Sequence, residues 1–259
     1  MSLEQDIKRG GYNQPQVPEE YERVVESDSK KQKTAEIMVS GIPKTIHLKS
    51  GDVGLAESTV LDLGSGTGII TDKIKDQAGK VISLDQAEVM VSHLKKRFSE
   101  NQNVEPVVGD MVKMPLADNA VEVIISAGAI KELPVIKDGK VKIEEIEGDF
   151  LKELMRVLKP GGICLLDSVR NAENDYVKRQ FVRRRQAELK RYRPEDEGRI
   201  FQRENIFLAE DLKDEKGQLL AKGIGTRLGD LGYKCEVESL FDLEGNDQSA
   251  VVRITLLEK

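Results

Sequence analysis

A glycine-rich turn between an apolar run and a helical pattern is the feature that most constrains this chain. The run 60–63 reads as a buried strand, and Gly64, Gly66 and Gly68 follow it. Glycine lets the backbone turn sharply and approach a ligand without a Cβ in the way. A helix that begins behind such a turn offers unpaired N–H groups and the positive end of its dipole. The turn therefore predicts a ligand site at the carboxyl end of a strand.

Short Val-, Ile- and Leu-rich runs alternate with helical patterns from Thr59 onward, which is typical of a parallel sheet. Aromatic residues make up only 4% of the chain and Trp is absent, so the core has to be mainly aliphatic. The expected strands are 59–63, 80–84, 104–108, 121–126 and 162–167. Near the C-terminus, runs 233–241 and 250–257 flank a Gly-Asn-Asp turn and predict an antiparallel strand pair.

The remaining segments divide the chain. Residues 1–55 are polar and broken by Gly and Pro, so we expect an irregular cap or lid with one helix at 29–40. Residues 56–259 form the main domain. Asp138-Gly139 lies between alternating residues and predicts a hairpin. Segment 171–205 is a charged, basic helical insertion after the fifth strand.

Charge and cysteine content exclude several protein classes. There are 40 Lys and Arg against 46 Asp and Glu, a net charge of -6, which argues against a basic coat for duplex nucleic acid. Uncharged stretches are too short to span a bilayer, and the N-terminus lacks a secretory signal. Two Cys without a CxxC pattern predict neither a disulfide framework nor a metal site. We expect a cytoplasmic protein.

An acidic residue at the end of the next strand indicates which class of ligand the site would bind. Asp85 follows Gly64 by 21 positions, where a carboxylate in a doubly wound sheet accepts hydrogen bonds from both ribose hydroxyls. The nicotinamide dinucleotide fingerprint is GxGxxG, but Ile69 takes its third glycine position. A nucleoside with a carboxylate tail therefore fits better than a dinucleotide, and a nicotinamide oxidoreductase is disfavoured.

Four segments together resemble the class I S-adenosylmethionine-dependent methyltransferases. The run 60–68 is similar to their motif I, and Asp85 resembles their ribose-binding acid. Segments 109–125 and 154–162 resemble their third and fourth strand region and their post-motif segment, in the family's order. The resemblance implies a Rossmann-like, doubly wound and mostly parallel seven-stranded sheet with a final antiparallel strand.

The resemblance also implies a set of S-adenosylmethionine-binding residues. In the first loop, Gly64, Ser65 and Gly66 would line the methionine part, with Gly68 closing the turn. Asp62 would orient that loop or the cofactor's amino group. Its alternative role is to cap a neighbouring helix or turn.

Further along the chain, Asp85 would hold the ribose with Gln86 beside it, and Asp110 and Met111 would meet the adenine. Ser126, at the end of the fourth strand, would lie near the sulfonium. Asp110 has the same alternative as a turn cap.

The sequence motifs that distinguish methyltransferase subclasses do not identify the catalytic residues or the methyl acceptor of this chain. Ser126-Ala-Gly-Ala-Ile130 replaces the Asn/Asp-Pro-Pro-aromatic run of nucleobase amino methyltransferases, and Cys164 reads as a buried strand residue. We favour a small-molecule acceptor, with S-adenosylhomocysteine as product. The alternatives are an RNA or protein methyltransferase using the basic helix 178–193, whose plainer interpretation is a solvated face, and a noncatalytic S-adenosylmethionine-binding module. The oligomeric state stays open.

Overall fold

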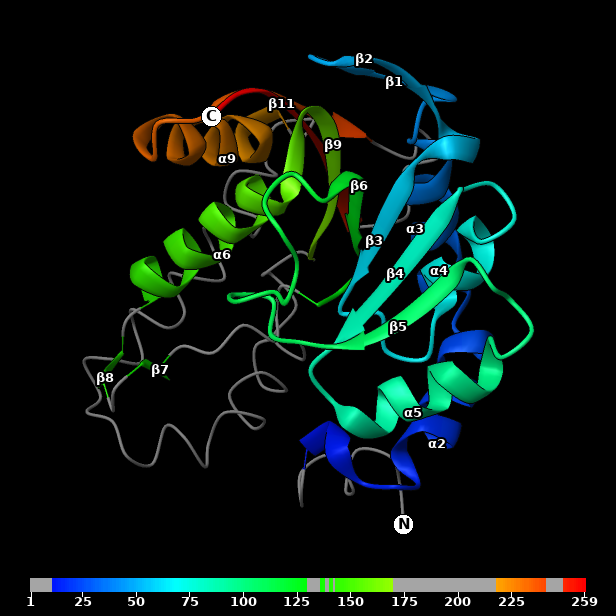
Figure 1. Ribbon diagram of the computed structural model, residues 1–259. Coiled ribbons are helices and arrows are strands. Elements are labelled where there is room, and N and C mark those ends of the chain that lie inside the picture. The colour runs from blue at the N-terminus through cyan, green and yellow to red at the C-terminus, as the bar shows by residue number, and fades with distance from the viewer. Residues whose placement is uncertain (1–10, 130–135, 138–139, 142, 170–217, 241–248) are drawn as a thin grey trace.

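A computed structural model describes residues 11–129, 136–137, 140–141, 143–169, 218–240 and 249–259. Its centre is a seven-stranded sheet in the order β10-β11-β9-β6-β3-β4-β5 (Figure 1). The strands are β3 (Thr59–Leu63), β4 (Lys80–Asp85), β5 (Val104–Val108), β6 (Val121–Ser126), β9 (Leu158–Val169), β10 (Lys234–Leu240) and β11 (Ser249–Glu258). The five expected parallel strands are all present.

The strand directions confirm the expected fold class. β3 pairs in parallel with both β4 and β6, and β5 and β9 continue the parallel array outward. β11 is antiparallel to both β9 and β10. The C-terminal pair thus differs in one detail from a simple edge hairpin, because β11 lies inside the sheet and β10 forms the edge. The strand order reverses between β3 and β6, where doubly wound sheets bind ligands.

Helices cover both faces of the sheet (Figure 1). They are α3 (Ser29–Ser40) and α4 (Ile69–Ile74) on one face, α6 (Ile143–Val157) and α9 (Gln218–Asp230) on the other, and α5 (Glu88–Arg97), which packs on β4 and β5. Strand residues alternate between the two cores: Leu61 and Cys164 face α6, whereas Val60 and Leu165 face α3 and α4. Burial on both faces explains why these strands are apolar at nearly every position.

The N-terminal segment is more ordered than its sequence suggests. It contains η1 (Gly11–Asn13), α2 (Val17–Ser27), the antiparallel pair β1 (Thr45–Leu48) and β2 (Gly51–Gly54), and η2 (Leu55–Glu57), besides the expected helix 29–40. The irregular cap predicted for this region is therefore wrong in part. Pro18, one of the prolines of this region, does not break a helix but lies in the first turn of α2, where proline is well tolerated.

Some predicted features lie partly or wholly outside the described residues. The strands β7 (Ile136–Lys137) and β8 (Lys140–Val141) pair antiparallel, as expected for the hairpin, whose turn 138–139 is not described. The insertion 171–205, with its basic helix 178–193, and the turn 245–247 also lie outside the described residues. Among the helices that the structure does describe, none has the length and apolarity needed to span a bilayer.

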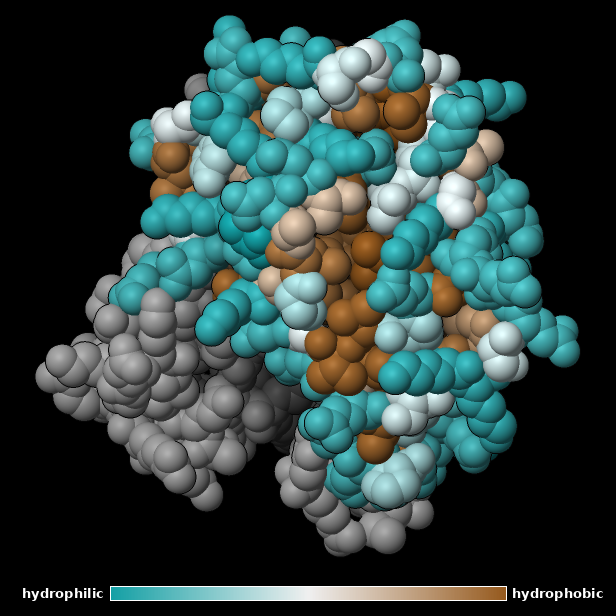
Figure 2. All heavy atoms as spheres, viewed as in Figure 1, coloured by the Kyte–Doolittle hydropathy of each residue, from teal (hydrophilic) through white to brown (hydrophobic). Residues whose placement is uncertain are grey.

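Residues 109–120 connect β5 to β6 as a loop that contains no helix. This loop crosses the face of the molecule seen in Figure 1. Met111, Val112 and Leu116 in this loop pack, partly buried, against the core beneath α6. Figure 2 shows hydrophobic atoms gathered in the middle of this face, with hydrophilic residues around them. This loop carries Met111 to the same edge of the sheet as Gly64 and Asp85.

Candidate functional site

The glycine turn has a backbone that side chains would disrupt. Gly64, Gly66 and Gly68 have φ values of 72°, 54° and 91°, in the left-handed region that favours glycine. A Cβ on Gly64 would lie 2.3 Å from the Cβ of Ala129, so this glycine lets the end of β3 approach the segment after β6. A Cβ on Gly68 would lie 2.7 Å from Leu94 in α5. Gly68 therefore serves the packing of α4 and α5.

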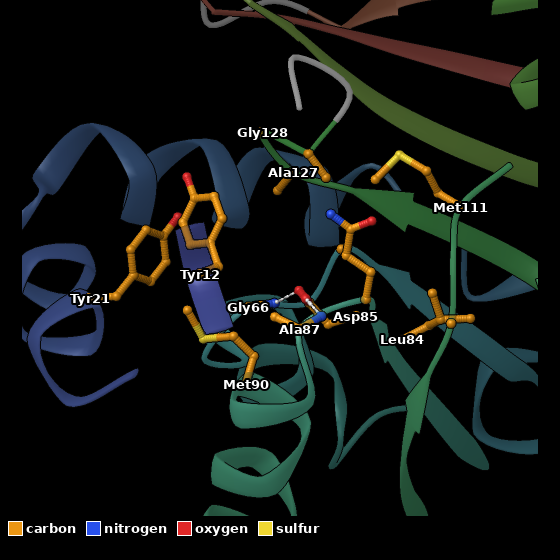
Figure 3. Close-up of a pocket in the computed structure, with 14 residues that line it drawn as sticks. Tyr12, Tyr21, Gly66, Leu84, Asp85, Ala87, Met90, Met111, Ala127 and Gly128 are labelled. Atoms are coloured by element: carbon orange, nitrogen blue, oxygen red, sulfur yellow. Dashed lines mark hydrogen bonds between the residues drawn. The ribbon is translucent and has the colours of Figure 1, made fainter. Parts of the chain in front are cut away.

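Asp85 fixes the turn from the end of β4. Its Oδ2 accepts a hydrogen bond from the backbone N–H of Gly66 at 2.9 Å, and its Oδ1 accepts one from Ala87 at 2.9 Å (Figure 3). Burial raises the pKa of this carboxyl, while its backbone hydrogen bonds act in the opposite direction. A carboxylate has about four acceptor sites, so each oxygen can accept a further bond from a ligand.

Asp62 lies behind the turn. Its Oδ2 accepts hydrogen bonds from the backbone N–H of Thr71 at 3.0 Å and from the Thr71 hydroxyl at 2.7 Å. The Thr71 hydroxyl also lies 2.7 Å from the hydroxyl of Ser83. These bonds satisfy a donor in the first turn of α4, which otherwise has no partner within the helix. Burial raises the pKa of Asp62 to about 7.

A pocket opens beside the turn at the carboxyl ends of the strands. Tyr12, Tyr21 and Met90 stand along one side of it, and Leu84 and Met111 along the other (Figure 3). The rings of the two tyrosines meet edge to face, with centroids 6.1 Å apart. The remaining wall consists of Gly64, Gly66, Asp85, Gln86, Ala87, Gly109, Ala127, Gly128 and Ala129. The wall is more apolar than polar, and its polar side chains are those of Asp85, Gln86 and the two tyrosines.

The pocket brings together five of the residues expected from the sequence, namely Gly64, Gly66, Asp85, Gln86 and Met111. The other five, which are Asp62, Ser65, Gly68, Asp110 and Ser126, are not part of its wall.

Three of these five have local partners. Asp110 accepts a hydrogen bond from the N–H of Val112 at 3.0 Å, and the Ser126 hydroxyl donates to the Leu63 carbonyl at 3.0 Å. Asp62 binds Thr71 as described above. Ser65 differs, because its buried hydroxyl has no hydrogen-bond partner among the described residues.

The sequence did not indicate the two tyrosines. Tyr12 belongs to η1 and Tyr21 to α2, in a segment expected to be irregular. Two signals point to a helix there: Pro18 followed by Glu19 and Glu20 is typical of a helix start, and Val17, Tyr21 and Val25 recur at helical spacing. Met90 is both a core residue, 2% exposed, and part of the pocket wall.

A known protein family matches the part of the chain that carries most of this site. Residues 61–166, from β3 to β9, match the family described as "Methyltransferase domain". The chain contains a class I S-adenosylmethionine-dependent methyltransferase domain. The match contains the glycine turn, Asp85 and the loop that bears Met111.

Curated relatives agree with this domain over part of their length. A probable S-adenosylmethionine-dependent methyltransferase of Mycolicibacterium smegmatis is 32% identical over 109 residues, which are 42% of this chain and 37% of the relative. A malonyl-[acyl-carrier protein] O-methyltransferase of Marinomonas sp. is 26% identical over 175 residues, 65% of this chain and 57% of the relative. The chain thus spans less than two thirds of each of these relatives.

Solved structures share the fold of the methyltransferase domain. A putative S-adenosyl-L-methionine-dependent methyltransferase from Methanococcus maripaludis superposes with a TM-score of 0.55 at 18% identity, covering 95% of both chains. The trans-methyltransferase CalH, in complex with SAH, gives a TM-score of 0.60 at 16% identity, covering 99% of this chain and 62% of that one.

Proposed function

We propose that this protein transfers a methyl group from S-adenosylmethionine to a small-molecule acceptor and releases S-adenosylhomocysteine. The observation that carries the proposal is the position of Asp85, whose carboxylate lines the pocket while it holds the glycine turn. This position supports the proposal, because carboxylate oxygens that could accept hydrogen bonds from ribose hydroxyls lie beside the backbone of the turn.

The pocket residues fit this cofactor in three respects. Asp85 retains acceptor sites for the ribose hydroxyls. Gly64 and Gly66 leave the turn without side chains, and the buried Ser65 hydroxyl between them lacks a partner among the described residues, which suits a polar cofactor tail. Met111 offers an apolar contact for a flat base.

The chain's contribution to the reaction is positioning. When bound, the cofactor supplies a methyl group activated by a positively charged sulfur. Asp85 and the glycine turn would hold the donor, and the tyrosine side of the wall would exclude water. Holding two reactants in attack geometry can contribute about 7–11 kcal/mol in favourable cases. The small residues Ala127, Gly128 and Ala129 leave room for an acceptor at the wall nearest β6.

Several further assignments belong to the proposal. Asp62 acts by fixing the turn, and Asp110 and Ser126 by fixing neighbouring backbone. Residues 1–55 act as a cap, which the presence of Tyr12 and Tyr21 on the pocket wall supports. A cytoplasmic location is supported by Cys164 and Cys235, which are both free.

The names of some relatives favour a small acceptor. A demethylmenaquinone methyltransferase of Staphylococcus saprophyticus is 30% identical over 132 residues, 48% of each chain. The alternative acceptor is RNA or protein bound by the basic run 178–193, and a noncatalytic binding module is the alternative to an enzyme. A charge-reversed 178–193 variant that keeps full activity would exclude electrostatic capture by that run.

Titration calorimetry tests the cofactor, and a metabolite screen tests the reaction. We expect S-adenosylhomocysteine to bind and NAD not to bind. Incubation with S-adenosylmethionine and a panel of small molecules should then yield S-adenosylhomocysteine. NAD binding in place of S-adenosylhomocysteine would contradict the proposal, and binding without turnover on small molecules, RNA or protein would support the noncatalytic alternative.

A further inference from the structure

One guanidinium joins the N-terminal helix to the glycine turn. Arg97, the last residue of α5, donates through Nη1 to Glu22 Oε1 in α2 and to the backbone carbonyl of Thr67 at 3.1 Å. Its Nη2 lies 3.7 Å from Glu26, one turn further along α2. Thr67 is part of the glycine turn and is 3% exposed. The same side chain therefore contacts the cofactor cradle and the helix that walls the pocket.

The contact on α2 is adjacent to the pocket wall. Glu22 follows Tyr21, whose ring lies against the turn: a Cβ on Gly66 would be 3.6 Å from Tyr21 Cε1. His93, one turn before Arg97 in α5, places its Nε2 3.3 Å from the other oxygen of Glu22. Any movement of α2 away from α5 would thus remove Tyr21 from the turn as well.

Arg97 connects α2 to the glycine turn more strongly than an exposed surface ion pair would. The side chains of Arg97 and Glu22 are 24% and 25% exposed, so water only partly screens their attraction. Charge-assisted hydrogen bonds are stronger than neutral ones, and the planar guanidinium can serve several acceptors at once. A lysine would supply the charge, but all its donors lie on one nitrogen and do not form the planar fork of a guanidinium.

We propose that Arg97 is a positioning residue that couples the docking of α2 to the glycine turn, so that cofactor binding and closure of the tyrosine wall favour each other. The proposal rests on the proposed function, since it takes S-adenosylmethionine or its product as the ligand. By linkage, a ligand that needs both the turn and the tyrosine wall will stabilise the docked position of α2.

Hydrogen exchange measured by mass spectrometry, with and without S-adenosylhomocysteine, tests this coupling. In the wild-type protein, the ligand should slow amide exchange in α2. Arg97→Ala should speed exchange in α2 without ligand, remove the protection by ligand, and weaken binding about tenfold, which corresponds to about 1.4 kcal/mol. Arg97→Lys should restore part of both effects, whereas a purely structural role would leave the ligand-dependent protection intact.

Two further variants keep the test decisive. Glu22→Gln removes the charge on α2 and leaves Arg97 able to bind Thr67, so it should loosen α2 even if Arg97→Ala fails to fold. Glu36→Gln is the matched control, because Glu36 pairs with Lys73 at 3.1 Å between α3 and α4, away from the turn. This control should change neither α2 exchange nor affinity.

The outcomes separate the two proposals. A wild-type protein that binds no S-adenosylhomocysteine would overturn the proposed function and the coupling with it. A wild-type protein that binds the ligand, together with Arg97→Ala and Glu22→Gln variants of unchanged α2 exchange and affinity, would overturn the coupling alone.

Discussion

The carboxylate of Asp85 accepts a 2.9 Å hydrogen bond from the backbone N–H of Gly66, which precedes it by 19 positions. This bond ties the end of β4 to the turn that follows β3. The residue proposed to hold the ribose thus also shapes the backbone against which the rest of the cofactor would lie.

Replacing Asp85 should therefore weaken cofactor binding in two ways. For both Asp85→Asn and Asp85→Ala we expect at least about a tenfold loss of affinity for S-adenosylhomocysteine, because charge-assisted hydrogen bonds each contribute roughly 1.5–3 kcal/mol. Calorimetry measures the loss, and Asp76→Asn, at an exposed position after α4, is the control. Unchanged affinity in Asp85→Ala would disprove the ribose role.

Two glycine substitutions should have opposite effects on stability. Gly64→Ala places a Cβ 2.3 Å from Ala129 at a φ of 72°, and the backbone strain alone costs about 1–2 kcal/mol. Gly148→Ala lies within α6, where a Cβ would meet no atom of the described residues within 4 Å, so it should stabilise the protein by about 0.5–1 kcal/mol. Chemical denaturation compares both with wild type. Equal stabilities of the two variants would contradict this account of the turn.

The buried carboxyl of Asp62 should make stability depend on pH. Its pKa is raised to about 7 in the folded protein, chiefly by burial, from 3.8. Between these values the folded state keeps a proton that the unfolded chain has released, so the contribution of Asp62 to stability falls as pH rises from about 4 to 7. The free energy of unfolding of Asp62→Asn should gain roughly 2–4 kcal/mol relative to wild type over that range.

Urea denaturation at several pH values measures this difference, with Asp76→Asn as the exposed comparison. Curves of stability against pH that run parallel for wild type and Asp62→Asn would show that burial does not control this carboxyl.

Arg156 of α6 should hold the loop that carries Met111. Its guanidinium donates to the carbonyls of Leu116 at 2.7 Å and Met114 at 3.1 Å, and to the carboxylate of Glu153. Arg156→Ala leaves these partly buried acceptors unpaired and should cost about 2 kcal/mol of stability. Thermal denaturation, together with amide exchange in the loop, measures the effect.

Lys80→Ala is the comparison for Arg156→Ala, since Lys80 pairs with Glu105 at an exposed position and should contribute less than about 1 kcal/mol. Similar stabilities for the two variants would mean that Arg156 is not needed to hold the loop.

The sequence predicted the sheet because burial on both faces leaves a continuous apolar signal. Runs 59–63 and 121–126, which are almost wholly buried, match the observed strands at both ends. Run 104–108 also matches its strand, β5, although this edge strand is partly exposed. The expected strand 162–167 corresponds to a longer strand, β9 (Leu158–Val169), which begins directly after the last residue of α6. A pattern of apolar residues does not distinguish the end of a helix from the start of a buried strand.

The site was harder to predict where it depends on distant segments. Asp85 and the glycine turn could be placed because parallel strands align their carboxyl ends at one edge. The contribution of Tyr12 and Tyr21 depends on the packing of α2 against α5. Val17, Tyr21 and Val25 recur at helical spacing in α2, but such spacing does not specify which helix they pack against. Ser126 was placed correctly on β6, but its hydroxyl turns toward the Leu63 carbonyl, a choice of direction that spacing does not specify.

The position of β11 between β9 and β10 has a consequence for the order of folding. β10 precedes β11 in the sequence, yet it contacts the rest of the sheet through β11. During synthesis, β10 and α9 therefore leave the ribosome before the strand that joins them to the parallel array. The edge of the sheet can be completed only after β11 has emerged, so assembly of this domain ends with its last strand.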